Sequence, residues 1–232
     1  PWDSLNLGIS RGDSDENVRE NYRRFCAAVG VTAESTVFTQ QTHSENIRLV
    51  TAQDAGKGLL RPRDYTEVDA LITDTPGLSL VVFSADCGTI LLYDPVHRAI
   101  GAVHAGWRGV AAGLVAKTAL KMHDTFGTEL GDLLCALGPA IGPCCFETDD
   151  DVPAAMHDAL GAQADPFLTR RGAKWHIDLK AINAHWLKSL GVRHIDICPH
   201  CTACRQDLYW SHRKVGNARG AQIALLALED PL

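Results

Sequence analysis

The chain has 232 residues, a formal net charge of −6 and a mean hydropathy of −0.06. Its size and composition are typical of one large or two small globular domains. The chain is negatively charged and contains no block of five like charges, which argues against nucleic acid as a partner. No apolar run approaches 18 residues, so the sequence predicts no transmembrane helix and no membrane partner.

Eight cysteines are present, which raises the question of disulfides. The adjacent pair Cys144-Cys145 and the lack of a recognisable leader favour reduced thiols, so we expect a cytoplasmic protein. The chain begins at Pro1 rather than at Met, and we expect a few N-terminal residues to be missing.

The first third of the chain predicts one helix and several short strands. Ser14 is a candidate N-cap for a helix that stops at Gly30. Residues 36–41 alternate like a strand and residues 46–50 like its return, which places His43 in their connection. Residues 51–66 lack a period and predict a loop, and residues 67–73 predict another strand.

The remainder of the chain alternates between strands and helices. Strands are predicted at 78–83, 89–93, 99–103, 133–137, 193–198 and 221–228, and helices at 108–126, 150–160 and 179–190. Because strands and helices are interspersed and no long linker separates them, we expect one domain over residues 1–232 with a mixed sheet.

The central stretch predicts a hairpin that brings two reactive side chains together. Asp94-Pro95 separates two strand-like runs and is typical of a turn, so these runs should pair antiparallel. With the turn centred near Val96, Cys87 lies opposite His104. Facing residues of an antiparallel pair have Cβ atoms about 4.5–5.5 Å apart, close enough for a thiolate and an imidazole to share one metal ion.

Several motifs in this stretch and beyond it resemble one known family. SADC (84–87), ILLYDP (90–95) and HAGWRG (104–109) resemble the YfiH-like, laccase-domain family, also called polyphenol oxidoreductase or purine nucleoside phosphorylase-like. The resemblance continues, in the family's order, through QQTHS (40–44), VDALIT (68–73), LGPAIGPCCFE (137–147), Cys201-Thr202, YWSHRK (209–214) and Arg219.

This resemblance implies a fold and a metal site. The fold is α+β, with mixed β-sheets packed together and flanked by helices, as in the catalytic domain of the cytotoxic necrotizing factor toxins. The implied metal ligands are His43, Cys87 and His104. Two His and one Cys leave a fourth position open, as in catalytic zinc sites, where zinc activates water near neutral pH. Copper could also bind this set of ligands.

The resemblance also implies purine nucleoside chemistry. Its members cleave adenosine, inosine and methylthioadenosine with phosphate and deaminate adenosine. We expect Arg108, beside the glycines that begin the 108–126 helix, to bind phosphate, with Arg213 as a weaker candidate. Gln41 and Asp69 are expected either to orient ligands and substrate or to support the site structurally. Cys145 and Cys201 are expected to line the substrate pocket.

Other functions are compatible with parts of the sequence. Cys87 could be a nucleophile with His104 as its base, in a metal-free hydrolase that would not need His43. A hydrolase that edits cell-wall precursors could use the same zinc. A copper-dependent polyphenol oxidase is disfavoured, because the chain has no His-x-His pair and Met122 and Met156 lie on predicted helices.

The spacing Cys198-x-x-Cys201-x-x-Cys204 is a competing metal signal. It resembles half of a metal knuckle or part of a ferredoxin motif, but no further Cys followed by Pro completes a ferredoxin cluster. We therefore expect Cys201 to line the pocket and Cys198 and Cys204 to be incidental.

Overall fold

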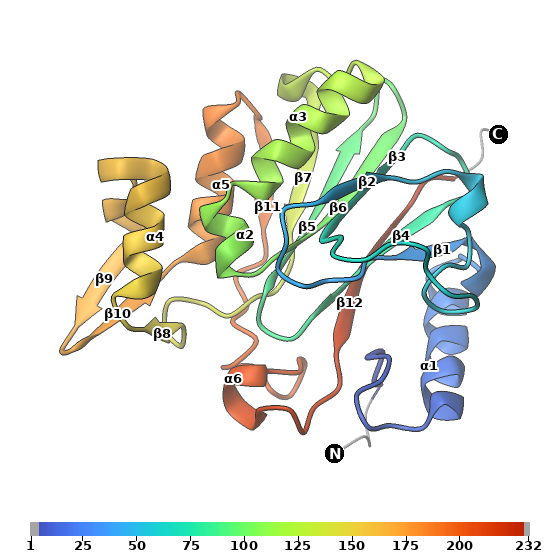
Figure 1. Cartoon of the computed structure of the whole chain (residues 1–232), viewed down its shortest axis with the longest axis horizontal. Helices are drawn as coiled ribbons and strands as arrows, with labels where there is room; N and C mark the ends of the chain where they lie inside the picture. Colours follow the sequence, from blue (N-terminus) through green and yellow to red (C-terminus); the bar gives the residue numbers. More distant parts are fainter. Residues whose placement is uncertain (1–4, 230–232) are drawn as a thin grey trace.

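The computed structural model describes residues 5–229 and contains a large six-stranded β-sheet that packs against a three-stranded one (Figure 1). Both combine parallel and antiparallel pairs, which confirms the predicted α+β fold with mixed sheets. One sheet has the strand order β11 (His194–Ile197), β7 (Leu134–Leu137), β5 (Gly88–Asp94), β6 (Ala99–Ala105), β3 (Ala70–Thr73), β2 (Ile47–Leu49), and the other the order β1 (Thr36–Phe38), β4 (Ser79–Ser84), β12 (Gln222–Ala227).

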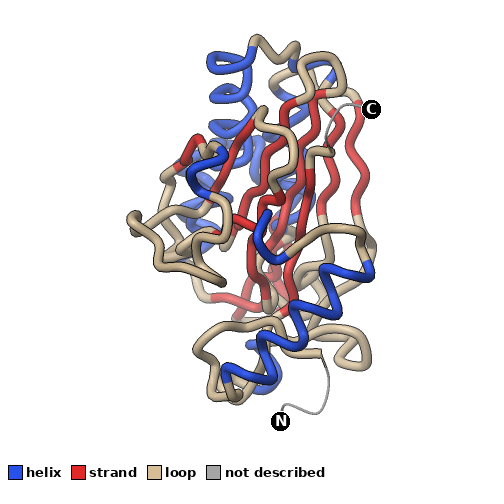
Figure 2. The backbone as a smooth tube through the Cα atoms, turned by 90° about the vertical axis from the view of Figure 1, so that its right-hand side faces the viewer, coloured by secondary structure: helices blue, strands red, loops and turns tan. Residues whose placement is uncertain are grey.

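A small antiparallel sheet and several helices surround these two sheets. In Figure 2, where the right-hand side of Figure 1 faces the viewer, the main strands lie side by side with their axes nearly aligned. The small sheet has the order β8 (Glu147–Thr148), β10 (Lys174–Ile177), β9 (Leu168–Arg171). The helices are α1 (Asp15–Ala28), α2 (Trp107–Ala111), α3 (Leu114–Phe126), α4 (Asp151–Leu160), α5 (Leu179–Ser189) and α6 (His212–Val215), with 3₁₀ segments at Ala33–Ser35, Ala52–Asp54, Leu130–Asp132 and Gly161–Phe167.

Side chains alternate between the two faces of each strand, so one face of β4 and one face of β6 form the interface between the two sheets. On β4, Leu80 and Val82 face the large sheet, whereas Val81 faces Tyr22 of α1 on the outside. On β6, Ile100 and Ala102 face the sheet formed by β1, β4 and β12. The alternate positions of β6 face the helical side, where Val103 joins the cluster that contains Leu114 and Val115 of α3. Every residue of β6 is buried as a result.

The helix predicted over residues 108–126 is two helices. Gly113 interrupts it with φ +67°, a left-handed conformation that separates α2 from α3. A Cβ at this position would lie 3.4 Å from the ring of Trp186, whose indole nitrogen donates to the carbonyl of Val110. The predicted single helix is therefore wrong, because a helix cannot continue through a residue with this φ.

The two strands predicted on either side of His43 do not pair with each other. β1 is parallel to β4, whereas β2 is parallel to β3 in the other sheet. The connection that carries His43 therefore crosses from one sheet to the other; both predicted strands are present, but their predicted pairing is wrong. Pairing of this kind depends on partners distant in sequence, which local alternation does not specify.

The predicted hairpin of β5 and β6 is confirmed, but its register differs from the prediction. Thr89, not Cys87, is the partner of His104, and Cys87 lies in the connection that precedes β5. The turn contains four residues, and the Asp94 carboxylate accepts from the backbone N–H of Val96 at 2.9 Å and of His97 at 3.0 Å. This local capping centres the turn after Val96 and shifts the register.

No helix in the described range is long and apolar enough to cross a bilayer.

Candidate metal centre and its pocket

Two connections and the end of one strand bring the predicted metal ligands together. His43 comes from the β1–β2 connection, Cys87 from the β4–β5 connection, and His104 from the end of β6. Their ligand atoms all lie within 4.8 Å of one another, with His43 Nε2 at 3.7 Å from Cys87 Sγ. The centroids of the two imidazole rings are 5.1 Å apart. The structure therefore assembles the three residues, although Cys87 reaches His104 from a connection and not as its strand partner.

The buried carboxylate of Asp69 orients His104. Asp69 immediately precedes β3, and its Oδ1 lies 2.7 Å from Nδ1 of His104. An ionised carboxylate can only accept hydrogen bonds, so Nδ1 of His104 donates. The backbone N–H of His104 also donates to the Asp69 carbonyl at 2.8 Å. Nε2 of His104 is thus left free to bind a metal ion. In zinc sites, a carboxylate that accepts from the other ring nitrogen of a histidine ligand commonly fixes it in this way.

The same carboxylate holds the loop that carries His43. It accepts from the backbone N–H of Thr42 at 3.1 Å, of His43 at 3.2 Å and of Ser44 at 2.8 Å, and from the Ser44 hydroxyl at 2.8 Å. These bonds support the left-handed backbone of His43, whose φ is +64°. Asp69 therefore positions two of the candidate ligands, whereas its contact with a substrate stays a prediction.

The electrostatics of the metal-free cluster favour a thiolate beside an imidazolium. Burial alone would raise the pKa of Cys87, but hydrogen bonds with His104 and His43 outweigh it and lower this pKa to about 6. Burial alone would lower the pKa of His104, but hydrogen bonds with Asp69 and Cys87 raise it to about 9. Burial alone would raise the pKa of Asp69, but the hydrogen bond and charge of His104, together with hydrogen bonds from Thr42 and Ser44, lower this pKa below its ordinary value.

Gly106 leaves the space that His43 occupies. A Cβ at Gly106 would lie 2.3 Å from Cδ2 of His43 and 3.3 Å from Sγ of Cys87. Its backbone angles, φ −67° and ψ 169°, are open to any residue, so packing alone requires glycine here. The first glycine of the HAGWRG motif thus belongs to the candidate metal centre.

The three donors fit a zinc ion. Zn–N bonds of about 2.0–2.1 Å and a Zn–S bond of about 2.3 Å, at tetrahedral angles, separate nitrogen from sulfur by about 3.6 Å. The 3.7 Å between His43 Nε2 and Cys87 Sγ agrees with this separation. Three protein ligands leave one position for water or substrate, which is the arrangement of catalytic sites.

Two pockets meet at this cluster. One has a volume of about 270 Å³ and the other about 380 Å³, the latter within the range of small-molecule sites. Their linings share Arg11, His43, Cys87 and Arg219, so the cluster lies on their common boundary.

Arginines concentrate on the larger pocket, which is lined by Arg11, Arg108, Arg213 and Arg219. Arg108 is exposed and stacks over the ring of Trp107, with its guanidinium carbon 4.2 Å from the ring centroid. Arg213 is tied to a loop, because it donates to the carbonyls of Cys145 at 2.9 Å and Glu147 at 3.0 Å. Burial and the like charge of Arg11 lower the pKa of Arg219. Two guanidinium groups so close to each other favour an anionic ligand.

Arg11, Arg219 and Asp86 are pocket residues that the sequence analysis did not assign. Arg219 was noted only as part of a motif, and nothing in its local pattern distinguished Arg11. Asp86 precedes Cys87 with φ +94°, and its carboxylate accepts from the Thr202 hydroxyl and from the backbone N–H of Arg213, each at 2.6 Å. It therefore joins the Cys87 connection to two segments near the C-terminus.

The side chain of Gln41 is used within the protein. It lies on the smaller pocket, but its amide donates to the carbonyl of Phe83 at 2.9 Å and accepts from the Phe83 N–H at 2.7 Å. Gln41 thus continues the pairing of β1 with β4 beyond the end of β1. This geometry supports the structural one of its two predicted roles.

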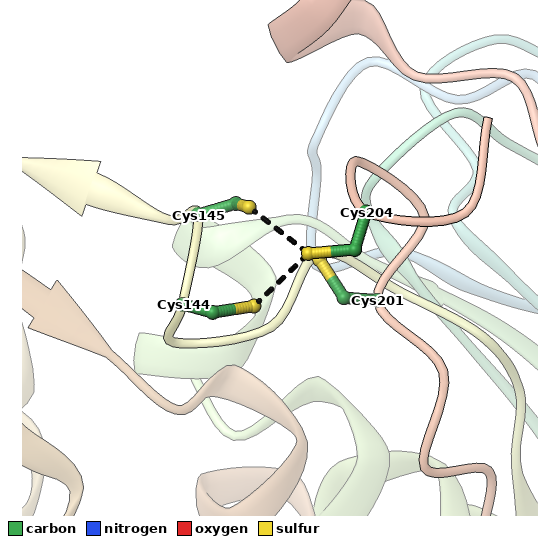
Figure 3. Close-up of side chains that lie close together, drawn as sticks. All are labelled: Cys144, Cys145, Cys201 and Cys204. Carbon is green, nitrogen blue, oxygen red and sulfur yellow. Dashed lines mark hydrogen bonds between the residues drawn. The ribbon is translucent and has the colours of Figure 1, made fainter.

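Cys145 and Cys201 lie away from both pocket linings and next to two other cysteines (Figure 3). Cys204, which we expected to be incidental, lies with its Sγ 3.4 Å from that of Cys145. The local sequence pattern did not predict this contact, because folding brings together two loops that are 59 residues apart in the chain. Burial alone would raise the pKa of Cys201, but the backbone N–H groups of Gly142 and Cys204 lower it to about 7.

Comparison with known proteins identifies the family. The model of the family described as multi-copper polyphenol oxidoreductase laccase matches residues 1–229. The chain belongs to this laccase-domain family. A relative named purine nucleoside phosphorylase YlmD, from Geobacillus stearothermophilus, is 33% identical over 237 residues, which cover 99% of this chain and 85% of the relative. A purine nucleoside phosphorylase of Mycobacterium tuberculosis is 35% identical over 217 residues, which cover 92% of this chain and 81% of that protein.

Solved structures of the laccase-domain family confirm the fold. The crystal structure of the Bacillus licheniformis hypothetical protein YfiH superposes with a TM-score of 0.94 at 31% identity, over 99% of this chain and 87% of that one. YlmD from Geobacillus stearothermophilus superposes with a TM-score of 0.92 at 32% identity, with the same coverage. The predicted family and the predicted packing of mixed sheets are therefore confirmed.

Proposed function

We propose that this chain is a zinc-dependent purine nucleoside phosphorylase that cleaves adenosine, inosine and methylthioadenosine with phosphate and also deaminates adenosine. The observation that carries the proposal is the convergence of His43, Cys87 and His104 on the boundary of two pockets, one of them lined by arginines. The names of its relatives support the phosphorylase part of this proposal.

His43, Cys87 and His104 would hold the zinc, with Asp69 keeping the proton on Nδ1 of His104. When bound, zinc supplies a Lewis acid and activates water near neutral pH. Copper is a weaker candidate, because Met122 and Met156, which could supply an axial sulfur, are fully buried in the core. The ten histidines also contain no His-x-His pair of the kind that gathers several coppers.

The arginines of the larger pocket would bind phosphate. Arg219 is half-buried and, like Arg11, lines both pockets beside Cys87. Guanidinium groups bind phosphate oxygens through charge-assisted hydrogen bonds. Arg108 can join them from the start of α2. Arg213 is the weaker candidate, since its guanidinium already donates to two backbone carbonyls.

The apolar part of the larger pocket would hold the purine. Trp107, Ile141, Phe146 and Leu179 line it, and the guanidinium groups of Arg108 and Arg213 lie over the rings of Trp107 and Phe146, at 4.2 and 5.5 Å from their centroids. Aromatic rings stack on purine bases, and apolar walls exclude water from the bond to be broken. A purine bound against these side chains would have its ribose near the arginines that would bind the phosphate.

Incubation of the purified protein with adenosine, with and without phosphate, tests this proposal. We expect adenine and ribose 1-phosphate only when phosphate is present, and inosine in both cases. Cys87→Ala and His104→Ala should abolish both activities and remove the zinc bound at this centre. Full activity of a Cys87→Ala protein without zinc at this centre would refute the assignment.

A metal-free cysteine hydrolase is the second candidate. It is favoured by the pKa of Cys87, lowered to about 6 by the two imidazoles. His43→Ala separates the two functions, because a zinc site needs this ligand and a Cys–His pair does not. Hydrolysis of a cell-wall precursor by the zinc-loaded protein, without any turnover of nucleosides, would assign the same centre to editing.

We propose the cytoplasm as the location, on the strength of the eight free cysteines.

A further inference from the structure

Four cysteines form a second cluster, outside the candidate metal centre (Figure 3). Cys144 and Cys145 lie on the loop between β7 and β8, and Cys201 and Cys204 lie on the segment that follows β11. The four Sγ atoms all lie within 4.8 Å of one another. Sγ of Cys204 is 3.6 Å from that of Cys144 and 3.4 Å from that of Cys145. In Figure 3 the four side chains point toward one another from two facing loops.

These separations match those of a tetrahedral thiolate site. Zn–S bonds of about 2.3 Å at tetrahedral angles place the sulfurs about 3.8 Å apart. A disulfide would need one pair of sulfurs at about 2.05 Å. Here Cys204 is almost equally far from two cysteines, so the geometry does not select a single bonded pair.

The backbone around the cluster is arranged for a metal site. The N–H of Gly142 donates to Sγ of Cys201 at 3.2 Å, a bond that stabilises a thiolate ligand. Thr202 N–H donates to the carbonyl of Ala140 at 3.2 Å, which fixes one loop against the other. A Cβ at Gly142 would lie 3.3 Å from Cβ of Cys201 and 3.4 Å from Sγ of Cys144, so glycine permits the close approach.

We propose that Cys144, Cys145, Cys201 and Cys204 bind a second zinc ion in a closed, structural site. Four protein ligands leave no open position, in contrast to the three at the candidate metal centre. Cys144 and Cys204 are exposed, which provides a path for the ion. This site does not depend on the function proposed above.

The second zinc would brace one wall of the larger pocket. The 138–146 loop supplies Ile141 and Phe146 to that wall, and the N–H of Ile141 donates to the carbonyl of Asp86 at 2.8 Å. From the other loop, the Thr202 hydroxyl donates to the Asp86 carboxylate at 2.6 Å. Both loops therefore contact the residue before Cys87, and an ion that joins them would hold the Cys87 connection in place.

Zinc content, measured on protein purified under reducing conditions without chelator, tests the site. We expect two zinc ions per chain in the wild type and one in Cys204→Ser or Cys201→Ser. Cys198→Ser is the matched control, since Cys198 is in the same segment but outside the cluster, and it should keep two. His43→Ala combined with Cys87→Ala should lose the other ion and keep the one at the four cysteines.

Cobalt(II) gives a second readout that does not depend on activity. A tetrahedral four-thiolate site should show strong sulfur-to-cobalt charge-transfer bands in the His43→Ala, Cys87→Ala protein, and Cys204→Ser should remove them. A zinc content in Cys204→Ser equal to that of the wild type would overturn the proposal, whatever the occupancy of the other centre. So would equal loss of metal in Cys198→Ser, or a Cys145–Cys204 disulfide found by mass spectrometry in protein kept reduced.

Discussion

His104 donates from Nδ1 to the carboxylate of Asp69 across 2.7 Å, and both side chains are buried. This contact joins the end of β6 to the residue before β3, which are 35 residues apart in the chain. The same carboxylate accepts from three consecutive backbone N–H groups of the His43 loop. One side chain therefore sets the tautomer of one candidate ligand and the position of another.

Asp69→Asn should weaken zinc binding at the candidate metal centre while all three ligands remain. Either orientation of the amide would place an N–H group against donors that now face a carboxylate oxygen, so the His43 loop and His104 lose their support. Loss of a hydrogen-bond partner of a metal ligand typically lowers metal affinity 10- to 100-fold, and we expect a loss of about that size. Competition with a chromogenic chelator measures it.

Ser44→Ala is the control for this substitution. It removes the hydroxyl that donates to Asp69 and leaves the backbone donors and His104 in place. We expect a several-fold smaller loss of affinity than in Asp69→Asn. Wild-type affinity in a folded Asp69→Asn protein would show that Asp69 does not position the ligands.

Gly106→Ala should displace His43 from the metal centre. The new methyl group would lie 2.3 Å from Cδ2 of His43, and the backbone of Gly106 accepts alanine without strain. We expect zinc affinity to fall by at least tenfold and the thermal unfolding of the metal-free protein to change little. Gly109→Ala is the matched control, because its Cβ would make an ordinary contact at 3.6 Å with Leu114. Equal zinc affinities in the two variants would contradict the steric argument.

Arg219→Ala should raise the KM for phosphate in the proposed phosphorolysis. It removes the half-buried guanidinium beside Cys87, and a rise of about tenfold corresponds to about 1.4 kcal/mol. Deamination of adenosine, which uses no phosphate, should keep its kcat. Arg193→Ala is the control, since Arg193 is exposed and pairs with Asp132 at 2.7 Å away from both pockets. An unchanged KM for phosphate in Arg219→Ala would move the phosphate site elsewhere.

Asp94 should contribute a pH-dependent part of the stability. Burial alone would raise the pKa of this carboxyl, but the hydrogen bonds from His97 and Val96 outweigh it and lower the pKa below its ordinary value. Because the native pKa lies below the unfolded pKa of about 3.9, the ionised side chain stabilises the protein above that pH. This contribution is lost as the pH falls through the native pKa.

Asp94→Asn tests this pH dependence by urea unfolding at several pH values. We expect the free energy of unfolding to decrease by about 1–3 kcal/mol at neutral pH, since a buried carboxylate loses charge-assisted bonds. The difference from the wild type should shrink as the pH is lowered below about 4. A difference that stays constant with pH would mean that ionisation of Asp94 does not contribute.

Local patterns predicted most of the elements. Ser14 does cap α1, where it accepts from the N–H of Asn17 at 3.2 Å, and Asp94-Pro95 does mark the hairpin turn. Capping and turn formation involve residues a few positions apart, so the sequence shows them directly. The register of the hairpin was wrong because the Asp94 side chain, through its bonds to the turn, centres the turn past Val96.

The family, the order of the main elements and, through the family resemblance, the three candidate ligands could be predicted from the sequence, because motifs and turn residues are properties of neighbouring positions. The surroundings of those ligands could not be predicted in this way. Asp69 beneath two of them, Arg11 beside Arg219, and Cys204 beside Cys145 are contacts between segments far apart in the chain. Such contacts depend on how two sheets pack and where their connections cross, and no local period encodes that packing.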